Sequence, residues 1–252
     1  MEISPLTVWS TPNKEEPNLI KLGIIGAMDV EVATLKDKME GKQVSWKTGM
    51  EFCDGTLEGL PVVVVQCGVG KVNAAMCAQI LCSVYGVTHL VNTGIAGSLC
   101  ADLDIGDLVV STDAMYHDFD TSPFGYPIGK VPGMPVTYPA DEKMMAYAFA
   151  AAEAVNPGHT RTGRVASGDQ FVSRKDQKAH IIEVTGAVCT EMEGAAIAHT
   201  AYRNEVPFVI LRAISDKADD SAEMDYPTFE RIAAHRCADV TTHLARQLKA
   251  SL

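Results

Sequence analysis

Short apolar runs, most of them rich in valine and isoleucine, alternate along this chain with segments of helical periodicity, and this alternation limits the fold most strongly. Strands that are buried on both faces read as continuous apolar runs, so the order predicts a mostly parallel sheet with helices on both faces, an α/β fold. Turn signals at CDG and EGLP within residues 44–66 predict an added antiparallel portion. The expected strands are residues 22–28, 60–68, 89–94, 107–117, 163–169, 186–191 and 207–216. The expected helices are one that carries Val32, Leu35 and Met39, then residues 71–85, 140–154, 174–183, 193–204 and 227–249.

The composition favours one globular domain that acts on a small molecule. The chain has 252 residues, of which 47% are hydrophobic, which is enough to bury a sizeable core, and we expect a single domain over residues 21–252. The formal net charge is −11. Binding to nucleic acid requires clustered lysine and arginine to neutralise phosphates, and we find no such cluster in the sequence. We therefore expect a small-molecule partner and no nucleic acid.

The cysteines and the first residues bear on location. The seven cysteines are scattered, form no C-x-x-C pair and stand mostly among apolar residues, so we expect reduced, buried thiols. Residues 1–20 have neither a basic region nor an apolar region of the kind found in signal peptides, and we expect them to form a flexible extension. No stretch approaches the roughly 20 apolar residues that a membrane span requires. These features predict a cytoplasmic protein without a membrane partner.

Acidic side chains follow three of the expected strands. Glu31, Glu193 and Asp216 each come at or just after the end of a strand, and the carboxyl ends of strands in an α/β sheet meet at the crevice where ligands bind. Taken singly, Glu31 fits a solvated first-turn carboxylate and Asp216 fits a helix cap. Three acids in one crevice with a single nearby arginine, Arg212, instead indicate proton-transfer chemistry.

The segment CTEMEGAAIAH places Glu191 and Glu193 two positions apart, directly before a run of small residues. Residues two apart lie on one side of a strand but do not face each other on a helix. The pair therefore predicts a strand end or turn that leads into a closely packed helix.

Three other patterns suggest cofactor or metal sites and are set aside. GVGK at residues 68–71 lacks the spacing of a phosphate-binding loop, and GIAGS at 94–98 lacks both the dinucleotide fingerprint and its supporting acid, so we expect no nucleotide cofactor. His117 precedes Asp118 and Asp120, but no second histidine stands at ligand spacing. We favour a structural role for His117 and expect no metal.

Seven fragments together carry a family resemblance: GIIGAMDVEVATL, GVGKVNAA, NTGIAGS, YHDFDTSPFGY, SGDQFV, EMEGAAIAH and RAISDKAD. In this order and spacing they resemble the 5'-methylthioadenosine/S-adenosylhomocysteine nucleosidases of the purine and uridine phosphorylase superfamily, over about residues 21–250. The resemblance implies a three-layer α/β/α sandwich with a mixed, partly closed central sheet and a homodimer. It also implies hydrolysis of the N-glycosidic bond to adenine, without metal or coenzyme.

The resemblance further implies roles for individual residues. Asp216 resembles the acid that delivers a proton toward adenine N7, and Glu31 resembles the carboxylate that activates the attacking water. These roles suit a reaction in which positive charge develops on the sugar and negative charge on the purine. Glu193 would bind the ribose 2'- and 3'-hydroxyls with Arg212 close by, and Glu191 would support it.

Further residues of the implied site contact the adenine, the ribose or the 5' group: Phe171, Val172, Met192, Met28, Val69, Ser215, Tyr226 and Ile95. Phe171 would stack on the adenine, and the backbone of Val172 would hold its Watson–Crick edge. Residues that the partner subunit would contribute to the 5' pocket are Phe124, Tyr126 and Pro132.

One departure from the family leaves the substrate range open. Ile95 stands where many members have a serine that helps to hold the water. Hydrolysis of 6-amino-6-deoxyfutalosine, an adenine nucleoside of menaquinone synthesis, is one alternative. A phosphorolytic purine nucleoside phosphorylase is a second, but AMDVEVATL after the first strand offers an acid and no arginine for phosphate. A non-catalytic nucleoside-binding protein is a third, ranked last because all the expected acids are present.

Overall fold

Ten strands form one mixed sheet in the computed structural model, which describes residues 20–219 and 222–251. The strands are β1 (Leu22–Gly26), β2 (Glu40–Lys47), β3 (Met50–Leu57), β4 (Leu60–Gln66), β5 (His89–Ser98), β6 (Leu108–Tyr116), β7 (Tyr138–Pro139), β8 (Thr160–Ser167), β9 (Cys189–Glu191) and β10 (Phe208–Asp216). The helices are α1 (Asp29–Lys38), α2 (Lys71–Ser83), α3 (Glu142–Val155), α4 (Lys175–Thr185), α5 (Gly194–Asn204) and α6 (Ala222–Ala250). Apart from residue 20, the expected N-terminal extension lies outside the described residues.

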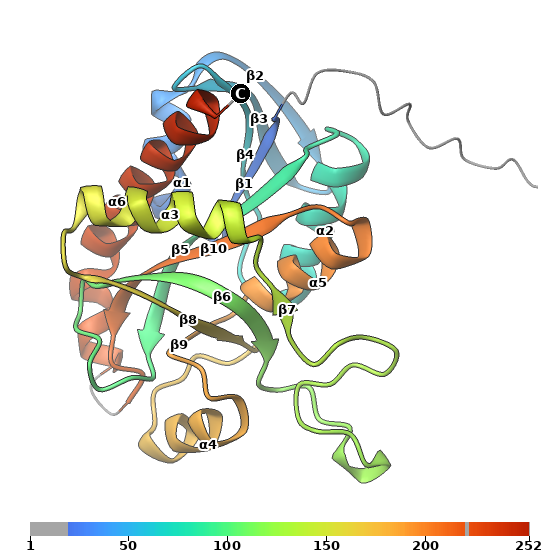
Figure 1. Cartoon of the computed structure of the whole chain (residues 1–252), viewed down its shortest axis with the longest axis vertical. Coiled ribbons are helices and arrows are strands. Elements are labelled where there is room, and N and C mark those ends of the chain that lie inside the picture. The colour runs from blue at the N-terminus through green and yellow to red at the C-terminus, as the bar shows by residue number, and fades with distance from the viewer. Residues whose placement is uncertain (1–19, 220–221, 252) are drawn as a thin grey trace, which may run out of the picture.

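Helices cover both faces of this sheet. Helices α1, α3 and α6 lie together on one face, and α2 and α5 lie on the other, which gives the three expected layers (Figure 1). Successive side chains of a strand point to opposite faces of the sheet. Because helices cover both faces, both sets of side chains are apolar and the strand reads as a continuous apolar run. In β4, Val62 and Val64 pack in the core under α1 and α6, whereas Val63 and Val65 pack in the core under α2 and α5. A polar residue at any of these positions would be buried.

The sheet closes on itself over part of its width. Strand β10 pairs in parallel with β5 and antiparallel with β6, β6 pairs with β8, β8 pairs with β9, and β9 returns to β5. The other end of the sheet runs from β1 through β4 and β3 to β2, and its last two pairings are antiparallel. The expected mixed and partly closed sheet, with an antiparallel portion near residues 44–66, is confirmed.

Several element ends differ from the sequence-based expectation, among them the ends of β1 at Gly26 and β4 at Gln66 and the start of β9 at Cys189. Strand β5 continues through the glycine-rich segment to Ser98 because β9 and β10 pair with that segment. Helix α6 begins at Ala222 rather than near residue 227, since Pro227 removes one backbone hydrogen bond without ending the helix. Strand β7 has only two residues and follows no recognisable pattern. None of the described helices is both long and apolar enough to cross a bilayer.

Candidate active site

A cavity of about 490 Å³ opens where several strands end. Its wall includes residues at or just after the ends of β1, β5, β9 and β10, the position at which α/β sheets bind ligands. The expected site residues in the wall are Met28, Glu31, Val69, Ile95, Phe171, Val172, Glu191, Met192, Glu193, Ser215, Asp216 and Tyr226. Six further lining residues were not predicted from the sequence: Ala27, Ala96, Gly97, Gln170, Thr190 and Pro227.

Glu31 is held in the first turn of α1 by backbone N–H groups. Its Oε2 accepts hydrogen bonds from the amides of Ala27 (2.7 Å) and Met28 (3.0 Å), and its Oε1 accepts one from Ile95 (3.1 Å). The side chain is buried, so it is not the solvated first-turn carboxylate considered above. Burial raises the pKa of Glu31, while Arg212 and the three amides oppose the rise.

Asp216 ends β10 in a different environment. Ala218 donates its amide to Oδ1 of Asp216, and the Ser215 hydroxyl donates to Oδ2, both over 2.8 Å. Burial raises the pKa of Asp216 above its ordinary value; the hydrogen bonds from Ala218 and Ser215 oppose the rise, and the nearby carboxylates Asp225 and Asp219 add to it. A carboxyl group in such a position retains its proton to a higher pH than one in water.

Glu193 lies between β9 and α5, in the turn that the sequence predicts. It is the N-cap residue of α5, yet its side chain makes no capping hydrogen bond to its own helix. Instead its Oε1 accepts the amide of Gly70 at 2.8 Å, across the cavity wall. Burial and the neighbouring charge of Glu191 raise the pKa of Glu193, with Arg212 opposing. Because the Glu193 side chain does not cap α5, it can face a ligand in the cavity.

The approach of α5 to the sheet depends on Gly194. A Cβ atom there would come within 2.8 Å of Ile210 on β10 and 3.0 Å of the Glu191 carboxylate. The small residues after the acidic pair therefore permit close packing, as the sequence predicts.

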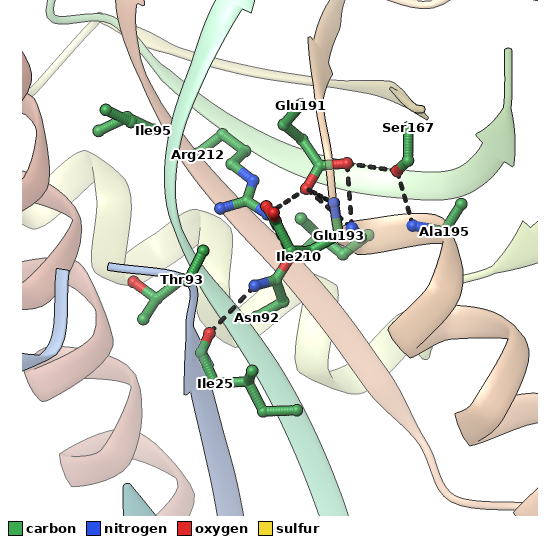
Figure 2. Close-up of polar contacts among 12 residues, drawn as sticks. Ile25, Asn92, Thr93, Ile95, Ser167, Glu191, Glu193, Ala195, Ile210 and Arg212 are labelled. Atoms are coloured by element: carbon green, nitrogen blue, oxygen red, sulfur yellow. Dashed lines mark hydrogen bonds and ion pairs between the residues drawn. The ribbon is translucent and has the colours of Figure 1, made fainter. Parts of the chain in front are cut away.

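Arg212 does not line the cavity. It is 1% exposed and lies behind the wall, where its Nη2 forms an ion pair with Glu191 and donates to Asn92, as Figure 2 shows. The same nitrogen lies 3.8 Å from Glu193. Arg212 therefore contributes its charge to Glu31 and Glu193 from outside the cavity, in contrast to the expectation that it belongs to the binding residues.

Aromatic and sulfur-containing side chains form the apolar side of the cavity. The rings of Phe171 and Tyr226 meet edge to face with centroids 5.5 Å apart, and the Tyr226 hydroxyl lies 3.2 Å from the sulfur of Met28. Phe171 is 48% exposed, so a planar ligand can reach its ring. This wall suits a flat heterocycle and an apolar substituent.

Residues after β6 link three strand ends beside the cavity. The Lys71 ammonium group contacts both carboxylate oxygens of Asp118, and Asp118 accepts the amide of Asp169. His117 is buried. Because Asp118 is already paired with lysine, the structural interpretation of the His117 segment is favoured over a metal site. The GVGK fragment predicts that Gly70 and Lys71 open a helix close to the substrate, and they do begin α2, beside Glu193 of the cavity wall.

The three residues expected from a partner subunit do not reach this cavity within the chain. Phe124 is 81% exposed, Tyr126 is 39% exposed, and Pro132 is also exposed. They lie on the loop between β6 and β7, which projects away from the rest of the protein (Figure 1). Phe124 is therefore not packed on the core of its own chain.

Comparisons with known proteins agree with this geometry. The family model of the phosphorylase superfamily matches residues 21–246. The structure is similar to 5'-methylthioadenosine/S-adenosylhomocysteine nucleosidase from Neisseria meningitidis in complex with methylthio-immucillin-A, with TM-score 0.88 and 34% identity over 91% of this chain and 100% of that one. The corresponding nucleosidase from Colwellia psychrerythraea 34H, in complex with adenine, gives TM-score 0.88 and 36% identity over 92% and 96% of the chains. Futalosine hydrolase of Helicobacter pylori gives TM-score 0.87 and 31% identity over 91% and 98%.

Proposed function

The chain belongs to the phosphorylase superfamily, and from this premise we propose that it is an N-glycosyl hydrolase of 5'-methylthioadenosine and S-adenosylhomocysteine. The reaction releases adenine and the 5-substituted ribose. The observation that carries the proposal is the cavity itself, which combines buried carboxyl groups in unlike environments with an exposed aromatic ring. The similar enzymes from Neisseria meningitidis and Colwellia psychrerythraea, with their bound nucleoside analogue and adenine, support this substrate class.

Asp216 acts as the general acid in this proposal. Departure of adenine places negative charge on the purine, and a proton delivered toward N7 neutralises it. The raised pKa of Asp216 favours the protonated form that the step requires. The Ser215 hydroxyl and the Ala218 amide hold the carboxyl group in one orientation.

Glu31 acts as the base that orients and deprotonates water. Its three amide donors stabilise the charged form needed to accept a proton, and the charge of Arg212 acts in the same direction. Ile95 touches this carboxylate through its backbone, a contact that does not depend on the side chain. The isoleucine that replaces the family's serine therefore leaves the carboxylate in place.

Glu193 binds the ribose 2'- and 3'-hydroxyls, with Met192 against the sugar. Phe171 stacks on the adenine, and truncating such a stacking residue costs roughly 1 to 3 kcal/mol per base in nucleic-acid binders. The backbone of Val172 holds the Watson–Crick edge, and Met28, Val69 and Tyr226 surround the 5' group.

Water is a better nucleophile than phosphate in this cavity. The lining residues include four carboxyl side chains, Glu31, Glu191, Glu193 and Asp216, and no lysine or arginine among the described part of the chain. A phosphate dianion would meet repulsion there, and Arg212 is already engaged by Glu191 and Asn92. These charges support hydrolysis over phosphorolysis.

A second substrate is 6-amino-6-deoxyfutalosine. The similarity to futalosine hydrolase of Helicobacter pylori favours it, because both kinds of relative match over nearly the whole chain. The adenine and ribose contacts proposed above apply equally to this nucleoside. The protein side chains around the 5' position would therefore determine which of the two nucleosides is preferred.

The active unit in this proposal is a homodimer whose subunits share active sites. Phe124, Tyr126 and Pro132 on the projecting loop of one subunit close the 5' pocket of the other. Their exposure and the projection of the loop support this arrangement. We place the enzyme in the cytoplasm, in methionine salvage and the recycling of S-adenosylmethionine by-products. All seven cysteines are free, as is typical of a reducing compartment.

Incubation of the purified protein with each nucleoside tests the proposal. Free adenine should appear from 5'-methylthioadenosine and S-adenosylhomocysteine at the same rate with and without added phosphate. Adenine release that requires phosphate, or none from any adenine nucleoside, would overturn it. The ratio of kcat/KM for 6-amino-6-deoxyfutalosine and 5'-methylthioadenosine decides the preferred substrate.

A further inference from the structure

The start of helix α5 is capped by residues other than its own N-cap. Backbone N–H groups in the first turn of a helix lack intrahelical partners, and the N-cap side chain usually satisfies one of them. Here the N-cap is Glu193, which makes no such bond. Glu191 accepts the amides of Glu193 (3.1 Å) and Gly194 (2.8 Å), and the hydroxyl of Ser167 accepts the amide of Ala195 (2.7 Å).

Ser167 connects this cap to the buried ion pair. Its hydroxyl accepts from Ala195 and donates its own proton to Glu191 Oε1, so one group completes both contacts, as Figure 2 shows. Glu191 in turn pairs with Arg212 through its other oxygen. Ser167 is fully buried at the end of β8, so no solvent replaces its hydrogen bonds when the hydroxyl is removed.

We infer that Ser167 is a positioning residue for ribose recognition: it takes over the capping of α5 and fixes Glu191, which leaves the Glu193 carboxylate free for the sugar. This inference rests on the proposed role of Glu193. Without the Ser167 hydroxyl, the Ala195 amide lacks a partner and Glu191 loses one of its donors. The Glu193 carboxylate belongs to the N-cap residue of α5, so it can then cap its own helix, and we expect it to turn away from the ribose.

Two variants at residue 167 remove the hydroxyl. Ser167→Ala deletes it, and Ser167→Cys replaces it with a thiol, a weak donor and acceptor of similar size. The matched control is Ser111→Ala, because Ser111 is also fully buried and its hydroxyl also accepts a backbone amide, that of Ile210 at 2.9 Å. Ser111 lies on β6 and has no part in the proposed chemistry.

The readout is discrimination between sugars. Values of kcat/KM are measured for 5'-methylthioadenosine and its 2'-deoxy and 3'-deoxy analogues, and the ratio of ribose to deoxyribose substrate is compared with that of the wild type. We expect both Ser167 variants to lower this ratio about tenfold or more. The contact that they weaken joins Glu193 to the ribose hydroxyls, so its loss affects the ribose substrate and not an analogue that lacks the hydroxyl in question. Ser111→Ala should lower thermal stability and leave the ratio unchanged.

The outcomes separate the inference from the function on which it rests. A wild type that releases no adenine from 5'-methylthioadenosine overturns the proposed function and this inference together. If the wild type releases adenine but a folded Ser167 variant keeps the ratio of ribose to deoxyribose kcat/KM within twofold of the wild-type value, the inference alone is overturned. Failure of both variants to fold, while Ser111→Ala folds, also overturns it, since Ser167 would then be essential to the fold rather than to orientation.

Discussion

Glu31 and Asp216 are both buried carboxyl groups, and burial raises the pKa of each. Their neighbours differ: the charge of Arg212 and three backbone amides oppose the rise at Glu31, whereas at Asp216 the hydrogen bonds from Ala218 and Ser215 oppose it and the carboxylates Asp225 and Asp219 add to it. At Glu31 the largest opposing influence is the positive charge of Arg212, which favours the charged form, and this difference is consistent with the proposed roles of Glu31 as base and Asp216 as acid.

Replacing Asp216 with asparagine should remove most turnover and leave nucleoside binding largely intact. The amide keeps the shape and the hydrogen-bonding capacity of the acid but supplies no proton, so we expect kcat to fall by about 100-fold or more. In the wild type, kcat should fall as pH rises through the raised pKa of Asp216, because the acid form is lost. The pH profile of Asp216→Asn should lack this limb. Steady-state kinetics over pH with direct binding of adenine measure both effects, and near-wild-type kcat would refute the assignment.

Replacing Glu31 with glutamine should also abolish hydrolysis, for want of a base. The substitution turns an amide NH₂ toward at least one of the three N–H donors that now face the carboxylate, so the free energy of unfolding should decrease by about 1–3 kcal/mol. Adenine release and denaturant unfolding are measured on the same preparation. If the folded variant released adenine at the normal rate, water would be activated elsewhere.

Strand β5 shows how an element sets the distance between charged groups. Its residue Gly94 lies against the guanidinium group of Arg212 and the carboxylate of Glu31, and a Cβ atom at this position would overlap both. The glycine is therefore required by close approach of side chains, not by its backbone conformation. Strand β5 therefore separates the carboxylate of Glu31 on α1 from the guanidinium group of Arg212 on β10.

Gly94→Ala should displace Glu31 and Arg212 together. We expect kcat/KM to fall by more than the loss of stability explains, about 100-fold, because small displacements of catalytic groups have large effects on rate. Gly163→Ala is the matched control: the three atoms nearest to its new methyl group on β8 all belong to the side chain of Val188. The control should be less stable but retain kcat when folded. Equal kcat in the two folded variants would contradict the role given to Gly94.

The alternation of apolar runs predicted the layers and most elements, because central strands such as β1, β4 and β10 are buried on both faces and are therefore apolar along most of their length. The end of β5 escaped prediction, since only pairing with β9 and β10 extends that strand past Gly94. Within the site, Glu31, Glu193 and Asp216 were identifiable from side-chain chemistry at strand ends. The amide of Gly70 was not, because every residue except proline carries such a group and only the fold brings it to Glu193.

In the whole molecule, the loop between β6 and β7 leaves the side chains of Phe124 and Tyr126 exposed. Phe124 leaves most of its surface exposed, and the cavity of the same chain does not include it. In the proposed dimer this ring closes the 5' pocket of the neighbouring subunit. The site is then complete only when two chains meet.

Phe124→Ala should weaken kcat/KM for 5'-methylthioadenosine about tenfold and spare adenosine, which lacks the alkylthio group, because only apolar contact to that group is lost. Phe149→Ala on α3 removes another partly exposed phenylalanine and should change neither substrate. Mixing Phe124→Ala with Asp216→Asn subunits should restore activity through one complete site per heterodimer, once subunit exchange is confirmed. Equal losses for both substrates with no recovery on mixing would contradict the shared site.

The central claim is that water, activated at Glu31, attacks the sugar of 5'-methylthioadenosine. The direct measurement is the mass of the sugar product formed in ¹⁸O-labelled water that contains unlabelled phosphate, with a control in which finished product is held in the same water to correct for exchange at C1. We predict free adenine and 5-methylthioribose that carries one ¹⁸O atom beyond the exchange control. Formation of 5-methylthioribose 1-phosphate, or of sugar without label from the solvent, would contradict the account.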